Sequence, residues 1–347
     1  MRSAQLLVER LWLGLLCIGA VACSGSGSDD ADGGADAGDA DGGTDASVVN
    51  DPYPHPCTYA RDLQADGIYD WISIYELDDE GRVIRDETDA DGDQDVDYLT
   101  LTTYDEDGRQ TRQTLDQDND GVVDLEHVND YRSDGQLKSQ IDYDGAGEEL
   151  HRLEYSYDDD GFLIEMFGYL PSADDHIEHP TRVTLENDDN GCMIGRIQDD
   201  HDDGVIEVVS EYEVEEDCHV LLEETDRHDD GVIDLVATYE YDEDGHAISE
   251  DFVVRDIRKL LRTTTYEGAL KMRVVEERAA SSDVTTYEYD DVGNLLRIDD
   301  DAFDDGMAIT TTKYENDARG NPLYVLIDDH GDGHPDDLAA YTYDCWE

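Results

Sequence analysis

Basic residues are scarce in this sequence. Its 347 residues contain 23 lysines and arginines against 92 aspartates and glutamates, which gives a formal net charge of −69 at pH 7. A surface this negative repels phosphate backbones and anionic lipid head groups, so nucleic acid and anionic membrane surfaces are excluded as partners. Salt adaptation is an alternative origin of the charge, whereas a disordered acidic chain is disfavoured by the 21 tyrosines.

Recognisable catalytic motifs are also lacking. We find no Ser-His-Asp or Cys-His arrangement, no two-histidine zinc motif and no glycine-rich phosphate loop. Pairs of carboxylates, which a polysaccharide hydrolase would use, are so abundant that they identify no site. We therefore expect a protein that is not an enzyme, with a secreted polysaccharide hydrolase as an alternative.

The apolar run near the N-terminus is too short to span a bilayer. Residues 11–22 form this run after a short segment with two arginines, as in a signal peptide. The run ends in Ala20-Val21-Ala22-Cys23, which resembles the lipobox of bacterial lipoproteins. The resemblance implies a lipid anchor at Cys23, and Ser24 after it implies export to the outer membrane. An ordinary secretory signal that is cleaved elsewhere is the alternative.

Composition then divides the chain into three parts. Residues 1–22 are the expected lipoprotein signal peptide. Residues 23–50 are almost wholly glycine, serine, alanine and aspartate, so we expect a disordered linker that holds the rest away from the membrane. Residues 51–347 are expected to form one β-repeat domain.

Two turn motifs alternate through this third part. One is an acidic loop and the other is a tyrosine-type residue followed by an Asp-Gly turn. The tyrosine-type positions recur about every 27 residues, at Leu77, Tyr104, Tyr131, Tyr157, Asn187, Val214, Tyr241, Tyr266, Tyr289, Asn316 and Tyr343. A fixed period of this length is typical of a repeat array.

The segments between the turns alternate as half-buried strands do. In one copy Ile233, Leu235, Ala237, Tyr239 and Tyr241 are expected on one face, and Asp234, Thr238 and Glu240 on the other. Because a sheet with one polar face must curl or stack to bury the other, we predict an all-β fold. It is an antiparallel repeat array of about eleven 27-residue two-strand units, arranged as a rolled sheet, a solenoid or a closed barrel.

The tyrosine turns resemble a known repeat family. The sequences YDEDG, YDDDG and YDDVGNLL are similar to the YD repeats of the RHS family, whose strands wind into a spiral shell. The resemblance covers residues 57–347, but here an acidic loop replaces the family's second turn. Members of that family can enclose a toxin, for which this chain has no room.

Few cysteines are available for disulfides. Once Cys23 is lipidated and the signal peptide is removed, four remain, which suggests two disulfides in an exported protein. Cys192 and Cys218 lie in turns of neighbouring units, so we predict that they pair. Cys57 and Cys345 then pair by default, which favours a closed ring over an open solenoid.

The acidic loops are candidate calcium sites. Calcium takes six to eight hard oxygen ligands, and alternate residues of a tight loop can direct carboxylates to one centre. The two best loops contain Asp116, Asp118, Asp120 and Asp124, and Asp89, Asp91, Asp93 and Asp97. They resemble the loops of EF-hands and, more closely, of thrombospondin type 3 repeats and dockerins. The bidentate glutamate of EF-hands is replaced by His127 and Thr100, so the resemblance implies the metal without the helical switch.

Four weaker copies keep the spacing. They contain Asp62, Asp66 and Asp70; Asp199, Asp203 and Glu207; Asp226, Asp230 and Asp234; and Asp328, Asp332 and Asp336. Three of them have a histidine, His201, His228 or His330, in place of the second ligand, which leaves open a transition metal or a simple Asp-Gly turn. The copies near Asp142, Pro180, Lys259 and Ser282 are degenerate.

These features predict a location and a cofactor better than a ligand. We expect an exported lipoprotein with a Ca²⁺-stabilised β-repeat domain that serves structure, adhesion or the binding of an extracellular protein or polysaccharide. The expected affinity of each loop is on the order of 10⁻⁴ to 10⁻³ M, as in other extracellular modules. A calcium or metal buffer at the cell envelope is a further alternative.

Overall fold

We analysed a computed structural model of the chain, which describes residues 55–168, 180–255, 257–302 and 306–346. The predicted signal peptide, the predicted lipidation site Cys23 and the predicted linker lie outside the described residues. Within the described part, no helix is long and apolar enough to cross a membrane.

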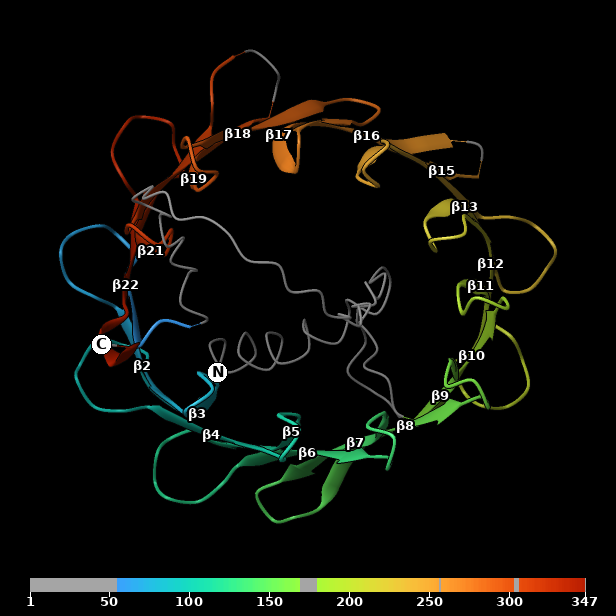
Figure 1. Ribbon diagram of the computed structural model, residues 1–347, viewed down its shortest axis with the longest axis horizontal. Helices are drawn as coiled ribbons and strands as arrows, with labels where there is room; N and C mark the ends of the chain where they lie inside the picture. Colours follow the sequence, from blue (N-terminus) through green and yellow to red (C-terminus); the bar gives the residue numbers. More distant parts are fainter. Residues whose placement is uncertain (1–54, 169–179, 256, 303–305, 347) are drawn as a thin grey trace, which may run out of the picture.

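The domain is a ring of 22 antiparallel strands (Figure 1). In chain order they are β1 Thr58–Asp62, β2 Trp71–Leu77, β3 Val83–Asp89, β4 Tyr98–Tyr104, β5 Gln110–Asp116, β6 Leu125–Tyr131, β7 Leu137–Asp144, β8 Glu149–Tyr157, β9 Leu163–Gly168, β10 Thr181–Asn187 and β11 Met193–Asp199. They continue with β12 Val208–Val214, β13 Val220–Arg227, β14 Leu235–Tyr241, β15 Ala247–Val254, β16 Ile257–Glu267, β17 Leu270–Glu277, β18 Ser282–Tyr289, β19 Leu295–Asp301, β20 Thr310–Asn316, β21 Pro322–Asp328 and β22 Asp337–Thr342. A short 3₁₀ helix, Asp344–Trp346, follows β22.

Each strand pairs with its neighbours in sequence, and β1 pairs with β22 to close the ring. The Cys57–Cys345 disulfide lies at this seam, where the Thr58 and Thr342 hydroxyls are 2.8 Å apart and the Arg61 guanidinium forms an ion pair with Asp337. Of the arrangements that the sequence left open, the structure is therefore the closed barrel. All-β class and antiparallel two-strand repeats are confirmed.

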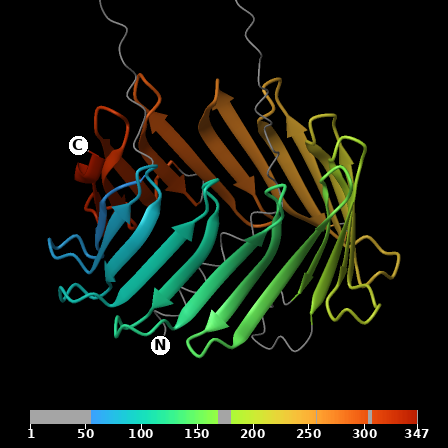
Figure 2. The same ribbon diagram turned by 60° about the horizontal axis from the view of Figure 1, so that its bottom comes forward.

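The two kinds of connection lie on opposite rims (Figure 2). Because all pairings between consecutive strands are antiparallel, odd-to-even connections such as β1–β2 share one end of the barrel, and even-to-odd connections share the other. The acidic loops are of the first kind and the Asp-Gly turns are of the second. We call these ends the acidic-loop rim and the tight-turn rim.

Most tight turns are built by an aspartate and a glycine. After β4, the Gly108 N–H donates to the Asp105 carbonyl at 3.1 Å, and the Asp105 carboxylate accepts the N–H groups of Asp107 and Arg109. Gly108 has φ +80°, a left-handed conformation that glycine adopts without strain. The register shifts beside the turn, between Thr103 and Tyr104, as expected for a hairpin with a bulge.

The predicted alternation holds inside β14 and fails just before it. Ala237 is fully buried while Thr238 and Glu240 are exposed. Ile233, however, is 42% exposed and Asp234 only 6% exposed, the reverse of the expectation. The reason is that the strand begins at Leu235, so both residues belong to the acidic loop and follow its geometry.

Small side chains provide much of the buried face of the sheet. Several of the buried strand positions lie four residues before the tyrosine-type position, namely Ser73, Val183, Ser210, Ala237 and Ala339. Serines there bond across the hairpin, as Ser73 does to Thr88 at 2.7 Å. The barrel wall is thus held by backbone pairing and small-residue packing rather than by one large apolar core.

In most units, the tyrosine or asparagine at the end of the unit couples it to the preceding unit. The Tyr131 hydroxyl donates to the Gln110 carbonyl at 2.8 Å, next to the bulge in the hairpin before it. The same contact is made by Tyr104, Tyr157, Tyr241, Tyr289 and Tyr343, and by the amides of Asn187 and Asn316. This bond satisfies a backbone carbonyl at an irregular point of the ladder, which explains a polar aromatic residue at the repeat position.

The substitution Tyr131→Phe is expected to lower the free energy of unfolding by about 1 kcal/mol, because it removes one such hydrogen bond and keeps the ring. Equilibrium unfolding in urea measures the change. Tyr98→Phe is the matched control, since the structure shows no hydrogen bond from the Tyr98 hydroxyl to any described residue. Equal losses in the two variants would contradict a coupling role for the tyrosine.

A second contact links neighbouring tight turns. In most units, the side chain that follows a turn glycine packs on the glycine of the next turn: a Cβ added at Gly135 would lie 2.8 Å from the Arg109 guanidinium. The Cys192–Cys218 disulfide occupies the same place, because Cys192 follows Gly191 and Cys218 stands where the next turn has its glycine. Cys218 accordingly has φ +66°. Both predicted disulfides are present.

Candidate functional site

Each acidic loop begins with an aspartate that binds the loop's own backbone. Asp62 is fully buried, and its carboxylate accepts the N–H groups of Gln64, Asp66 and Gly67 at 3.3, 3.0 and 2.7 Å. Burial alone would raise the pKa of the Asp62 carboxyl, but these N–H groups outweigh burial and lower it. The carboxylate therefore stays ionised inside the loop.

The ninth loop residue closes the loop from the other side. Asp124 accepts the Gln117 N–H at 2.7 Å, and Asp97 accepts the Ala90 N–H at the same distance. Carboxylates at the first and ninth positions thus hold the loop between two strands. A plain acidic turn would explain these bonds without any metal.

Two loops go further and bring three carboxylates together. One oxygen from each of Asp116, Asp118 and Asp124 lies within 4.8 Å of the others, and the same holds for Asp89, Asp91 and Asp97. These are the two loops that the sequence ranks first. A cluster of three hard carboxylate oxygens fits part of a calcium coordination shell.

The fifth loop position does not join these clusters. The Asp120 carboxylate accepts the Val122 N–H at 2.8 Å, and the Asp93 carboxylate accepts the Asp95 N–H at 2.9 Å. In the second loop Gln94 occupies the place of Gly121 and takes φ +78°, which a residue with a side chain adopts less readily. Three carboxylates, rather than four, therefore face each candidate centre.

The four weaker copies have the backbone of the loop without this convergence among the described residues. Their first residues, Asp62, Asp199, Asp226 and Asp328, bind loop N–H groups as Asp116 does. In the last copy the His330 imidazole lies 2.9 Å from the Asp336 carboxylate, which raises the pKa of His330 and lowers that of Asp336. This histidine acts as an ion-pair partner inside its loop.

Neighbouring acidic loops touch along the rim. The His228 N–H donates to the Glu207 carbonyl of the preceding loop at 2.5 Å. A Cβ added at Gly92 would lie 2.3 Å from the Tyr69 carbonyl oxygen, so these two loops are in backbone contact. The backbones of the loops in these two pairs are therefore in direct contact.

The degenerate copy near Asp142 is part of a cross-strand cluster instead. Asp142 on β7 pairs with His127 on β6 and with His151 on β8. The His127 Nδ1 lies 2.7 Å from the Asp142 carboxylate, and its Nε2 lies 3.1 Å from the Asn129 side-chain oxygen. The bond to Asp142 outweighs burial and raises the pKa of His127.

A pH-dependent contribution to stability follows from this cluster. Because the folded pKa of His127 is raised, its contribution is present below the unfolded value of about 6.5 and is lost as pH rises through the folded pKa. We expect His127→Gln to cost about 1 to 2 kcal/mol at pH 5.5 and clearly less at pH 8.5. Urea unfolding at the two pH values measures this, and an equal cost at both would contradict a charged imidazole. Gln113 on β5 lies opposite His127, and His151 lies beside the Asp142 carboxylate.

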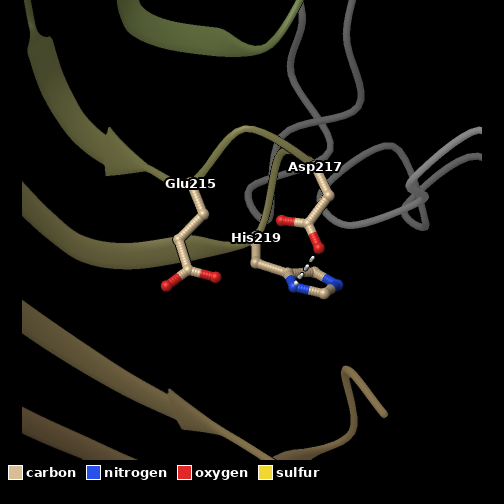
Figure 3. Close-up of side chains that lie close together, drawn as sticks. All are labelled: Glu215, Asp217 and His219. Atoms are coloured by element: carbon tan, nitrogen blue, oxygen red, sulfur yellow. Dashed lines mark ion pairs between the residues drawn. The ribbon is translucent and has the colours of Figure 1, made fainter. Parts of the chain in front are cut away.

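Two further clusters lie on the tight-turn rim and were missed in the sequence. They consist of Glu215, Asp217 and His219 (Figure 3), and of Asp242, Asp244 and His246, again with one ligand atom of each residue within 4.8 Å of the others. The sequence did contain a signal for these clusters, because both histidines stand at the fifth position of turns that align with each other.

Comparison with known proteins gives no family. No protein-family model matches the chain, and no curated protein matches it. Among solved structures, a TcdB2-TccC3-TEV crystal structure is similar at 12% identity and TM-score 0.30, over 79% of this chain and 20% of that one. The Photorhabdus luminescens Tc holotoxin pore gives 13% identity and TM-score 0.26, over 77% of this chain and 21% of the other.

A porin-like protein from Bacteroides uniformis is similar at 13% identity and TM-score 0.31, over 63% of this chain and 94% of that one. This chain spans about a fifth of the length of the Tc structures that it matches. Values this low transfer no function to this chain.

Proposed function

We propose that this protein is an exported bacterial lipoprotein whose closed β-barrel is stabilised by calcium and serves as a structural or ligand-binding module at the cell envelope. The observation that carries the proposal is the convergence of three carboxylates in each of the two loops with the best spacing. The lipobox-like sequence that ends at Cys23 supports the anchor and the outer-membrane location.

The ring geometry gives calcium a structural role. The acidic loops share one rim, and each connects two strands of the wall (Figure 2). Mutual repulsion of three carboxylates in a loop is unfavourable, and a divalent cation reverses that sign. Where adjacent loops are in backbone contact, a cation bound in one loop would also tighten its neighbour. A rim ordered in this way is a suitable support for adhesion to an extracellular protein or a polysaccharide.

Isothermal titration with Ca²⁺ tests the proposal. We expect two sites with dissociation constants on the order of 10⁻⁴ to 10⁻³ M, one for each converging loop. Asp118→Asn is the sharpest variant, because the structure shows no hydrogen bond from a described residue to the Asp118 carboxylate. It should weaken one site about tenfold and leave the calcium-free protein as stable as before.

Asp134→Asn removes one carboxylate from the tight-turn rim and is the matched control for net charge. It should leave both sites unchanged. If no heat were measured at millimolar Ca²⁺, or if Asp134→Asn weakened binding as much as Asp118→Asn, the loops would be acidic turns held only by their own backbone bonds.

A further inference from the structure

The fifth position of the tight turns carries a cation in two early units. Arg109 donates to the carboxylates at the first and third positions of its turn, Asp105 at 2.8 Å and Asp107 at 2.7 Å. Its guanidinium also lies over the ring of Tyr131 in the next unit, 4.8 Å from the centroid. Arg82 makes the same contacts one unit earlier. In these turns a fixed positive charge neutralises part of the carboxylate pair.

Two consecutive later turns replace this guanidinium by an imidazole. His219 follows Glu215 and Asp217, and His246 follows the equivalent residues Asp242 and Asp244. The His219 Nδ1 lies 3.1 Å from the Asp217 carboxylate, and the three side chains point to the same side of the turn (Figure 3). In both turns one ligand atom from each of the three residues lies within 4.8 Å of the others.

The imidazoles are held in place by the next unit. The His219 ring stacks on Tyr241, with centroids 4.5 Å apart and planes 11° apart. It also covers the next turn's glycine, since a Cβ added at Gly245 would lie 2.9 Å from the His219 Cε1. His246 stacks on Tyr266 at 4.6 Å and 19°. Both rings are thus oriented before any ligand arrives, which lowers the entropic cost of binding.

The turn backbone orients the carboxylates as well. The Asp242 carboxylate accepts the N–H groups of Asp244 and His246 at 3.0 and 2.9 Å with one oxygen, and its other oxygen faces the imidazole at 3.1 Å. In the first turn the Cys192–Cys218 disulfide ties the residue before His219 to the neighbouring hairpin. The donor groups in each turn therefore come from a rigid five-residue frame.

Charge and donor type identify the ligand. An imidazole, unlike a guanidinium, releases its proton near neutral pH and then offers a lone pair. Two carboxylates with such an imidazole form a doubly negative site with one nitrogen and two oxygen donors. Calcium prefers oxygen alone, whereas zinc and neighbouring divalent transition metals take nitrogen together with carboxylate oxygen.

We propose that the turns 215–219 and 242–246 are two adjacent binding sites for divalent transition-metal ions, each formed by one imidazole and two carboxylates. Three protein ligands leave coordination positions open to water or to a group on a partner. The sites lie on the rim opposite the acidic loops, and the proposal does not depend on calcium binding there. They differ from the histidine-containing acidic loops, where His330 is paired with a single ninth-position carboxylate.

The test is titration of the tag-free mature protein with Zn²⁺ in a few millimolar Ca²⁺, which occupies hard-oxygen sites. We expect two Zn²⁺ per chain, one of which is lost in His219→Arg and both in the double variant with His246→Arg. Arginine at these positions reproduces the turns of Arg82 and Arg109, so the variants should keep the circular dichroism and calcium response of the wild type. Cu²⁺ in place of Zn²⁺ should show hyperfine coupling to one nitrogen per ion in its paramagnetic resonance spectrum.

A gain of binding provides the converse test. Arg109→His places an imidazole beside Asp105, Asp107 and Tyr131, the counterparts of Asp242, Asp244 and Tyr266. It should add a third Zn²⁺ per chain. The proposal is overturned if the double arginine variant binds Zn²⁺ as the wild type does, or if copper shows no nitrogen coupling. Wild-type protein that takes up no Zn²⁺ would overturn it as well.

Discussion

Replacement of Cys57 and Cys345 by serine is expected to lower the free energy of unfolding of the barrel by about 5.7 kcal/mol. The seam disulfide closes a loop with a sequence separation of 288, and the loss of chain entropy that a crosslink imposes on the unfolded state grows with the logarithm of that length. In the serine variant, the ring is held closed at the seam without the disulfide, by contacts such as the hydrogen bond between the Thr58 and Thr342 hydroxyls. Denaturant unfolding of both proteins measures the difference.

The second disulfide is the matched control. Cys192 and Cys218 are separated by only 26 residues, so the same relation gives about 3.5 kcal/mol for their removal. Cys192→Ser with Cys218→Gly is the suitable pair, because glycine restores the residue that the other turns have at this left-handed position. A seam variant that lost less stability than this pair would show that ring closure contributes little.

Calcium is expected to raise the free energy of unfolding by about 3 to 5 kcal/mol at roughly 10 mM, relative to protein in chelator. Each site with a dissociation constant on the order of 10⁻⁴ to 10⁻³ M contributes about 1.4 to 2.7 kcal/mol at that concentration, and two loops converge. Thermal unfolding followed by circular dichroism should therefore show a large, saturable rise in melting temperature.

Two comparisons make this result specific. Asp91→Asn with Asp118→Asn should remove most of the calcium effect while both loops keep their first and ninth aspartates. Magnesium should act much more weakly, because it demands a smaller octahedral site. If NaCl raised the melting temperature as much as calcium does, the negative charge would instead be explained by salt adaptation. If calcium did not raise the melting temperature, the loops would be turns held only by their own hydrogen bonds.

The fold was predictable because its local signals repeat. Tyr104 and Tyr131 mark strand ends, and Asp-Gly pairs mark the turns after them, in register with a period that the structure keeps. The cysteines Cys57 and Cys345 then favoured a closed ring over an open solenoid, a choice that the repeat period and the apolar alternation alone left open. Redundancy among units compensated for units in which the pattern is weak.

Contacts between units were harder to predict, because they join residues about 26 positions apart whose chemistry varies. Arg109 on Gly135 and Cys192 bonded to Cys218 are the same contact, although the residue types share nothing. In the sequence, this contact was indicated by Cys218, a cysteine at a turn position where the other units have glycine. Asp142 looked like the remnant of a metal loop and is instead the cross-strand partner of His127.

In the candidate sites too, local spacing was predictable and contacts between units were not. Spacing identified the two loops that bring Asp89, Asp91 and Asp97, or the equivalent three, together. It did not show that Asp93 turns to the backbone, since that depends on the position of the Asp95 N–H. His219 was overlooked because its meaning depends on the Tyr241 ring of the following unit.

The seam lies on the tight-turn rim, since β1 starts and β22 ends there. Ten tight turns join the other hairpins, and the Cys57–Cys345 sulfur bridge stands in the eleventh place. The ring therefore has no geometrically privileged first unit. A circular permutant, with the seam bridged by a short peptide and the chain opened at another tight turn, would keep every strand pair. Opening it at an acidic loop would move the two chain ends of the barrel to the acidic-loop rim.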